Sequence, residues 1–566
     1  MKFQEGFEQA IHFHKEGRFD LAEDYYRQIL NLPIDNESLS DRAEAYSNLG
    51  VLFKKKGAVE EALQAYEMAI QLAPEWAIAY SNLGNLFLEK KQFQKAATLY
   101  QKALQRDPKY IQAYCNLGAA LRELKQNDGC ILALRLASEI DPKHYGAAFN
   151  LAQILAETNQ LEESLVWFQR CLTINPQHEG AQLNLGNALR KLGRLDEAIE
   201  RYQLILNGNP QDCGALCNLA VALKEKGKVN EAWKILEKAS RIRPNLAEIE
   251  VNQAVLLFLQ RKWKEGFRKY EARFRIPGGP KIPSPQIPVW TGREPLEGKS
   301  ILVFTEQGFG DMIQFARYLE PLSKQADQVF LQIPKRMHRL FGNFVSTRLQ
   351  LLDKEDLILP NCDFQTSIMF LPSGLDLDPD SFPMTEPYMK AEPKLIEKWK
   401  HQMSADSDHI LKIGLFWQGN KNYSEDQTRS IPLKQFEPLL KIRDKRIAFF
   451  SLQRGEGAEQ IQQLAFDSFF RNPLDEDQWD SPDAFVDTAA ILKNLDLLIT
   501  SDSSVVHLAG ALGVSTWLLL SKIPDWRWLL RGQKTSWYPT IKIFRQSHLG
   551  EWQSVFTRVQ EQVHSK

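Results

Sequence analysis

The first half of the chain repeats one arrangement of apolar and small residues every 34 positions. A recurring leucine predicts the buried face of a first helix in each repeat: Leu49, Leu83, Leu117, Leu151, Leu185 and Leu219. The next residue is always small, which would let helices approach closely: Gly50, Gly84, Gly118, Ala152, Gly186 and Ala220. A second helix is predicted by alanines and aromatics that share one face: Ala62, Ala96, Ala198 and Ala232, with Tyr66, Tyr100, Phe168 and Tyr202.

A proline keeps the same 34-residue step: Pro74, Pro108, Pro142, Pro176, Pro210 and Pro244. Because proline lacks a backbone N–H and clashes with the preceding turn, we expect it to end the second helix of each unit. This period and these positions resemble the tetratricopeptide repeat closely over residues 7–275. Later units are expected to begin near Asp41, Trp76, Tyr110, His144, His178, Asp212 and Leu246. An irregular first unit, Phe7–Leu32, is set apart by the polar insert Asp35–Asp41, so residues 1–275 are predicted to form an all-α tetratricopeptide solenoid of about eight units.

Seven asparagines also stand 34 residues apart: Asn48, Asn82, Asn116, Asn150, Asn184, Asn218 and Asn252. Asparagine is a mediocre helix former, costing roughly 0.5 kcal/mol relative to alanine at each site. In the repeat family this position faces the concave groove, where a ladder of amides would bind the backbone of an extended polypeptide. Each such hydrogen bond contributes about 0.5–1.5 kcal/mol. The alternative is that the amides bond neighbouring helices.

The pattern changes after the helical repeats. Residues 276–298 are rich in proline and predict a semi-rigid connector. From Lys299, short apolar runs alternate with segments of helical length, which indicates parallel sheets with helices on both faces. The predicted strands are Ile301–Phe304, Val329–Ile333, Ile413–Trp417, Ile447–Leu452, Leu497–Thr500 and Thr516–Leu520, and a closing helix is predicted over Glu551–Val563. We therefore expect two α/β lobes, at residues 299–395 and 396–566.

Composition narrows the possible partners. The 566 residues carry 70 basic and 71 acidic side chains, which gives no electrostatic reason to expect binding to nucleic acid. The start lacks the apolar run of a signal peptide, and uninterrupted apolar stretches of about 18 residues are missing, so no transmembrane helix is expected. The six cysteines are scattered, which favours reduced thiols and a cytoplasmic protein.

The first candidate motif follows the strand Ile301–Phe304. Gly308 and Gly310 fit part of a dinucleotide-binding pattern, but Ile313 stands at its third glycine position. The glycines would instead let some other group approach the backbone closely. Asp311 lies at the predicted helix start, and the alternative to a chemical role is a capping box with Gln314.

The second motif follows the strand that ends at Thr500. A helix of small residues is predicted to begin near Ser504, and its free N–H groups, with the Ser503 and Ser504 hydroxyls, suit a phosphate or diphosphate. His507 lies one turn into that helix and could donate to the same ligand. The alternative is that Asp502 or Ser503 is a plain cap and that His507 is a packed helix residue.

Two polar loops, Trp417–Pro432 and Ser451–Gly457, follow neighbouring predicted strands. Ligands gather at the carboxyl ends of strands in open parallel sheets, so these loops and the 502–507 segment predict an anion-binding rim. The candidate residues in the two loops are Trp417, Gln418, Arg429, Gln453 and Arg454. The segment Asp376–Asp380 has the spacing of an acidic metal motif, but no predicted strand precedes it, which favours a solvated acidic loop.

Three segments, Glu306–Leu319, Trp417–Pro432 and Thr500–Leu520, resemble the heptosyltransferase-like glycosyltransferases, whose fold is the GT-B pair of Rossmann-like lobes. The whole layout resembles tetratricopeptide-fused enzymes such as the protein O-GlcNAc transferases. The resemblance implies inverting, metal-independent sugar transfer from a nucleotide-sugar, with no other cofactor. It implies that Asp311 is the general base and that Arg429 is the basic residue of the donor site.

The same resemblance places a family glycine on Gly310 and the family's donor-site segment on Asp502, Ser503, Ser504 and His507, and Gly308 is a further donor-binding candidate. Ser504 replaces a glycine of the family pattern. The acceptor would be a hydroxyl, either Ser or Thr of a polypeptide held in the solenoid groove or a group on a glycan or lipid. The alternative is a scaffold whose transferase region no longer turns over. The joint presence of Asp311, Arg429, Asp502 and His507 favours the enzyme.

Overall fold

The computed structural model describes residues 2–33, 39–356, 358–383, 385–404, 410–421, 426–442, 444, 446–463, 470–471, 483 and 485–565. The middle of the predicted polar insert, at 34–38, and the middle of the Trp417–Pro432 loop, at 422–425, lie outside these residues. The chain divides into two compact units, Met1–Ala222 and Leu223–Lys566. Each unit is described by itself.

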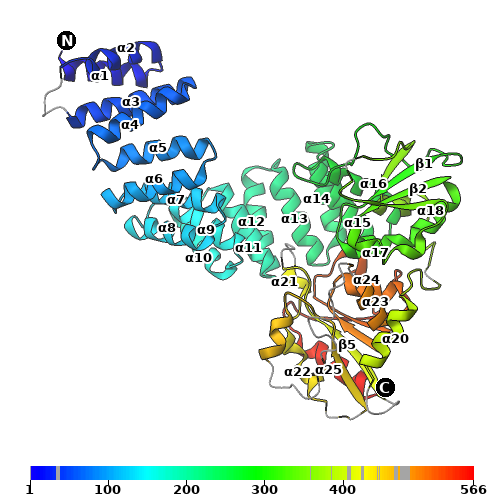
Figure 1. The fold of residues 1–566 in the computed structure, drawn as a ribbon. Coiled ribbons are helices and arrows are strands. Elements are labelled where there is room, and N and C mark those ends of the chain that lie inside the picture. The colour runs from blue at the N-terminus through cyan, green and yellow to red at the C-terminus, as the bar shows by residue number, and fades with distance from the viewer. Residues whose placement is uncertain are drawn as a thin grey trace. The chain divides into compact units, whose positions relative to one another are not determined.

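The first unit is a stack of antiparallel helix pairs (Figure 1). Its helices are α1 (Phe3–Lys15), α2 (Phe19–Leu30), α3 (Leu39–Lys56), α4 (Val59–Leu72), α5 (Ala77–Glu89), α6 (Phe93–Arg106), α7 (Ile111–Glu123), α8 (Asn127–Ile140), α9 (Tyr145–Glu157), α10 (Leu161–Ile174), α11 (Glu179–Lys191) and α12 (Leu195–Gly208). Helix α13 (Cys213–Glu225) spans the division between the units. The repeat register predicted from the sequence is confirmed after the first unit, because the first helix of each later unit begins within two residues of its predicted start, whereas α1 begins four residues before Phe7.

Close packing between paired helices explains the recurring small residue. A Cβ atom added to Gly50, Gly84 or Gly186 would lie 2.6–2.7 Å from a ring carbon of the tyrosine sixteen residues later. Those tyrosines are almost fully buried, so the methyl group has no space. Helices α4 and α6 end two residues before Pro74 and Pro108, as expected for a residue that cannot continue the hydrogen-bond ladder.

The second unit begins with the remaining helices of the repeat region. These are α14 (Val229–Ile242), α15 (Ala247–Leu259) and α16 (Trp263–Tyr270), followed by a 3₁₀ segment, η2 (Glu271–Arg275). They share one hydrophobic core with the α/β region, to which Phe258, Trp263 and Phe267 contribute. Within the predicted connector, Val289 forms a parallel bridge with Gln365. The connector is therefore attached to the edge of a sheet at this point.

The first sheet has four parallel strands in the order β3-β2-β1-β4. They are β1 (Ser300–Phe304), β2 (Gln328–Ile333), β3 (Leu349–Asp353) and β4 (Phe364–Ser367). The associated helices are α17 (Phe309–Phe315), α18 (Leu319–Gln325), α19 (Leu371–Gly374) and α20 (Pro393–Gln402). Helix α17 follows β1 directly, so its N-terminal end lies at the carboxyl edge of this sheet.

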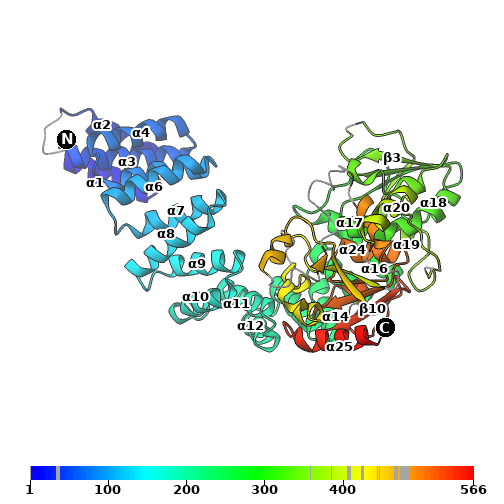
Figure 2. The ribbon, with the colours of Figure 1, turned by 60° about the horizontal axis from the view of Figure 1, so that its bottom comes forward.

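The second sheet has six parallel strands in the order β10-β9-β8-β5-β6-β7. They are β5 (Leu411–Phe416), β6 (Ile447–Ser451), β7 (Phe470–Arg471), β8 (Leu497–Thr500), β9 (Thr516–Leu520) and β10 (Ile541–Arg545). The helices are α21 (Asp426–Arg429), α22 (Glu437–Leu440), α23 (Val486–Leu492), α24 (Ser504–Ala511) and α25 (Gln553–His564). The predicted closing helix is confirmed as α25, which lies beside β10 (Figure 2).

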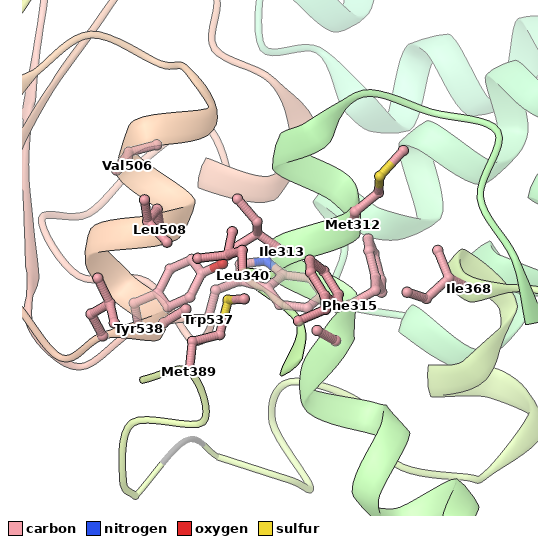
Figure 3. Close-up of a cluster of buried hydrophobic side chains, with 14 of the residues drawn as sticks. Met312, Ile313, Phe315, Leu340, Ile368, Met389, Val506, Leu508, Trp537 and Tyr538 are labelled. Atoms are coloured by element: carbon pink, nitrogen blue, oxygen red, sulfur yellow. The ribbon is translucent and has the colours of Figure 1, made fainter. Parts of the chain in front are cut away.

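Helices α17 and α24 pack against each other, so the first turns that follow β1 and β8 are brought together. Their contact is surrounded by buried apolar side chains from both sheets' connections, among them Ile313, Phe315, Val506, Trp537 and Tyr538 (Figure 3). This core fixes the position of the candidate site described next.

Candidate functional site

The two principal sequence motifs, almost 200 residues apart in the chain, meet where α17 packs on α24. Gly310 lies at this contact: a Cβ atom there would be 2.9 Å from Cδ2 of His507 and 3.5 Å from Cα of Ser504. Only glycine leaves enough room for the two helices at this separation. The glycine motif after β1 therefore serves the approach of another part of the same chain.

Asp311 uses both carboxylate oxygens in hydrogen bonds. Its Oδ2 accepts from the backbone N–H of Gly308, 3.1 Å away, and its Oδ1 forms an ion pair with Nη2 of Arg527. The expected capping role of Asp311 is confirmed, but the expected pairing with Gln314 is wrong, because α17 begins at Phe309 and its N-cap is Gly308. Asp311 is thus the third residue of the helix, and it reaches back to the N-cap, Gly308.

Arg527 was not identified from the sequence. It lies in the short 3₁₀ segment η10 (Trp526–Trp528) that follows β9, and its side chain is 12% exposed. Its Nε donates to Oε1 of Gln314 at 2.8 Å and its Nη1 to Oδ1 of Asp525 at 2.9 Å. Burial would lower the pKa of Arg527, but Asp525 and Asp311 outweigh it and raise the pKa, so the guanidinium stays charged. Its position after a strand end was the available sequence signal.

The segment after β8 leads into α24, and the side chain of its N-cap residue makes no capping hydrogen bond. Ser503 is the N-cap residue, and its Oγ is buried and has no hydrogen-bond partner among the described residues, as is also true of Oγ of Ser501. Asp502 is buried beside them. Burial and the nearby Asp525 carboxylate raise the pKa of Asp502 to about 6, against the opposing effect of Arg429 and Arg527. Buried polar groups without partners are rare and suit a ligand that supplies the missing bonds.

His507 is packed tightly one turn into α24. Its ring stacks on Trp528 with centroids 5.4 Å apart, and its Nδ1 lies 3.0 Å from the Tyr538 hydroxyl. Burial, with Arg527 and Arg429 nearby, lowers the pKa of His507 well below its usual value, so the ring is neutral near pH 7. Tyr538 contacts the Nδ1 side of the ring, and the Nε2 side faces Gly310. A Cβ atom added to Gly310 would lie 3.6 Å from Nε2 of His507.

The loops after β5 and β6 are joined to each other. Oε1 of Gln453 accepts from the backbone N–H groups of Trp417 and Gln418, at 3.2 and 2.9 Å, and its Nε2 donates to the Gln418 carbonyl. Trp417 is fully buried in the core on the α25 side of the sheet. Nε2 of the buried Gln418 has no partner among the described residues, whereas Arg454 is exposed. Trp417 and Gln453 thus hold the loops in place.

Arg429 ends the short helix α21. It contributes charge at both Asp502 and His507, which brings the loop after β5 into the electrostatic environment of the α24 segment. Gly419 makes room beside it, because a Cβ there would lie 3.4 Å from an Arg429 side-chain nitrogen. The structure therefore gathers Asp311, Arg429, Asp502, Ser503 and His507, and adds Arg527.

All seven asparagines of the ladder are half-buried on the first helices of their repeats. Two make hydrogen bonds between repeats: Nδ2 of Asn82 donates to Oγ of Ser47 at 2.9 Å, and Nδ2 of Asn116 donates to Oδ1 of Asn85 at 2.8 Å. These two amides bond neighbouring helices, and each also keeps a partly exposed surface.

The acidic segment Asp376–Asp380 exposes Asp376 and Asp380 to solvent, as expected, and it also contacts the end of the repeat region. Asp380 accepts from Nε1 of Trp263 at 2.8 Å and pairs with Arg261 at 2.7 Å. Asp376 pairs with Lys264 at 2.6 Å.

Among the described residues, no group of three or more His, Cys, Asp or Glu side chains is placed to hold a metal ion. None of the described helices is long and apolar enough to cross a membrane.

Comparison with known proteins identifies the repeat region. Residues 30–256 match the tetratricopeptide family described as the Cilia and flagella-associated protein 70 C-terminal domain. The chain is 26% identical over 339 residues to protein FlbA of Caulobacter vibrioides (strain ATCC 19089 / CIP 103742 / CB 15), covering 56% of this chain and 54% of FlbA. It therefore spans about half the length of that relative.

The chain is also similar to solved tetratricopeptide-type structures over part of its length. YrrB, described as a TPR protein with an unusual peptide-binding site, is 24% identical, with 33% of this chain and 96% of YrrB covered and a TM-score of 0.31. Pseudomonas aeruginosa pilF is 22% identical, with 39% and 98% covered and a TM-score of 0.33. The repeat register, the helix pairs and the family match together show a tetratricopeptide-type helical region over residues 30–256, and parallel sheets follow it in the chain.

Proposed function

We propose that this protein is an inverting, metal-independent glycosyltransferase with a GT-B-like pair of lobes. The observation that carries the proposal is the contact of Gly310 with Ser504 and His507. It brings the glycine–aspartate motif after β1 beside the helix start after β8, which is the arrangement that transfer between an acceptor and a nucleotide-sugar requires. The resemblance to heptosyltransferase-like enzymes gives these two segments the same roles.

In the proposed reaction the acceptor hydroxyl oxygen attacks the anomeric carbon of the sugar. Asp311 takes the hydroxyl proton, the new glycosidic C–O bond forms, and the bond between the sugar and the diphosphate breaks. The nucleotide diphosphate leaves with the bonding electrons. Asp311 is 18% exposed, so it can meet an acceptor from solvent.

The leaving diphosphate would lie at the start of α24. Free N–H groups at a helix start and the buried Ser503 hydroxyl can bind its oxygens, and Arg429 supplies positive charge. His507, neutral near pH 7, can donate or accept a hydrogen bond without adding charge. These groups replace the role that a divalent cation has in other transferases.

The tetratricopeptide region would present the acceptor or a partner protein. The half-buried asparagine ladder supports binding of an extended polypeptide, and a polypeptide Ser or Thr is the acceptor we favour. A glycan or lipid acceptor, with the solenoid as a docking arm, is the variant of the same proposal.

Calorimetric titration with UDP, GDP and ADP tests the donor site, using the full chain and the variants His507→Ala and Arg429→Ala. We expect one nucleotide to bind the wild-type protein selectively and both variants to lose most of that affinity. A folded wild-type protein that binds none of the three would refute the proposal and favour a scaffold.

A further inference from the structure

The guanidinium of Arg527 joins the two segments of the candidate site and leaves none of its three nitrogens without a protein partner. Nε bonds Gln314 and Nη2 pairs with Asp311, both on α17, while Nη1 bonds Asp525 on its own loop. Because β1 precedes α17 and β9 precedes Arg527, this one side chain ties the carboxyl edge of the first sheet to that of the second.

The surroundings of Arg527 hold its side chain still. The guanidinium carbon lies 4.2 Å from the centroid of the Trp526 ring, and that ring stacks at 4.2 Å on Phe258 of α15. Gln314 is fully buried. A side chain fixed by ring contacts and three charged or polar partners is suited to orient a neighbour and poorly suited to follow a moving ligand.

We propose that Arg527 is the positioning residue for Asp311, a role that rests on the glycosyltransferase function proposed above. The backbone N–H of Gly308 holds one carboxylate oxygen of Asp311 and Arg527 holds the other, so the carboxylate has a single orientation. A carboxylate has about four acceptor sites, so it can still receive the proton of an acceptor hydroxyl. Arg527 acts through Asp311: each of its three nitrogens already has a protein partner, and two of these partners lie on α17.

The orientation of the base, Asp311, depends on a second segment of the chain. Asp311 on α17 receives its Arg527 contact from the loop after β9, so the orientation of the base depends on the contact between these two segments.

The test is a double-mutant cycle in the full chain with Arg527→Lys and Asp311→Asn. Nucleotide release is measured with UDP-glucose, UDP-N-acetylglucosamine, GDP-mannose and ADP-glucose, and affinity for the matching nucleotide is measured by calorimetry. Lysine keeps the charge but cannot hold Gln314, Asp311 and Asp525 at once. We expect Arg527→Lys to lower kcat about 100-fold, the effect of misplacing a catalytic group by about 1 Å, with nucleotide affinity changed less than about threefold.

In the Asp311→Asn background, Arg527→Lys should change kcat less than about threefold, because the residue acts through the group already removed. The control is Arg317→Lys, which alters another buried arginine of the same region. Arg317 donates to the carbonyls of Trp537 and Phe382 and does not contact Asp311, so kcat should stay within about threefold of wild type.

The possible results separate the two proposals. Additive losses in the cycle, or a loss of nucleotide affinity as large as the loss of kcat, would overturn positioning and leave the glycosyltransferase proposal standing. A folded wild-type protein that releases nucleotide from none of the four donors would overturn the proposed function, and positioning with it. Guanidinium ion restoring turnover to Arg527→Ala would support positioning, because only the missing cation is returned.

Discussion

A single methyl group at Gly310 tests the contact on which the candidate site depends. In Gly310→Ala the new Cβ would lie 2.9 Å from Cδ2 of His507, closer than such carbons approach each other in proteins. The His507 ring cannot turn away, because it is buried, stacks on Trp528 and is bonded to Tyr538. The helices α17 and α24 must therefore separate.

The size of the effect follows from two opposing terms. Overpacking of a close contact costs about 1–3 kcal/mol. Alanine is favoured over glycine within a helix by roughly 0.5–1 kcal/mol, which offsets part of that cost. We expect the free energy of unfolding of the second unit, Leu223–Lys566, to fall by about 1–2 kcal/mol. The affinity for the nucleotide identified by calorimetry should fall as well.

Urea unfolding followed by tryptophan fluorescence measures this loss, and Gly342→Ala is the matched control. Gly342 lies in the same unit, in the 3₁₀ segment η5 (Gly342–Phe344), and a Cβ there would have no heavy atom within 4 Å. The control should unfold within about 0.5 kcal/mol of wild type. Equal stabilities for the two alanine variants would refute the close packing of α17 on α24.

Three further predictions follow from other parts of the chain. Gly186→Ala, whose Cβ would lie 2.6 Å from the Tyr202 ring, should lower the thermal midpoint of the solenoid, whereas Gly208→Ala, in open space in the same repeat, should not. Burial raises the pKa of Asp502 to about 6 in the folded protein, so folding favours the protonated carboxyl group. The free energy of unfolding is therefore highest below about pH 4, where the group is protonated in both states, and it falls as the pH rises through about 6. Asp502→Asn should therefore be more stable than wild type at pH 7.5 in urea unfolding, with the difference disappearing near pH 4. Asn116→Ala with Asn150→Ala should weaken use of a polypeptide acceptor and leave donor hydrolysis unchanged, and equal use of the polypeptide would remove the groove hypothesis.

The repeat region was predictable because its signals are local and are repeated. The spacing of Pro74 and its equivalents, and the small residue opposite each buried tyrosine, each describe one helix pair, and the structure has both. The connector was less predictable, since its bridge from Val289 to Gln365 depends on a strand 76 residues away.

The sheets were predicted only where strands are buried on both faces. Leu497–Thr500 and Thr516–Leu520 are continuous apolar runs, and the structure has strands at these residues. The strands Leu349–Asp353, Phe364–Ser367 and Ile541–Arg545 were not predicted, because all three lie at sheet edges and polar residues interrupt their apolar pattern. The two-residue strand Phe470–Arg471 is too short to leave any pattern.

Candidate site residues were easier to find than their partners. Asp311, Asp502 and His507 follow glycine turns or strand ends, which local sequence reveals. Arg527 is defined by partners more than 200 residues away in α17, and a single arginine between two tryptophans gives no sign of them. The same limitation produced the capping-box interpretation, because the ion pair that engages Asp311 cannot be read from residues 308–314.

The residues just before α24 bury polar groups at a cost in folding free energy, and this cost supports a role in binding a ligand. Asp502 is buried where its charged form is disfavoured, and the hydroxyls of Ser501 and Ser503 are buried without partners among the described residues. An unsatisfied buried polar group typically costs about 1–3 kcal/mol. Apolar or smaller residues at these three positions before α24 would avoid the penalties, so packing alone does not account for them. A ligand that accepts bonds from both hydroxyls and from the helix N–H groups would recover much of the loss, and an anion such as a diphosphate has the acceptor oxygens to do so.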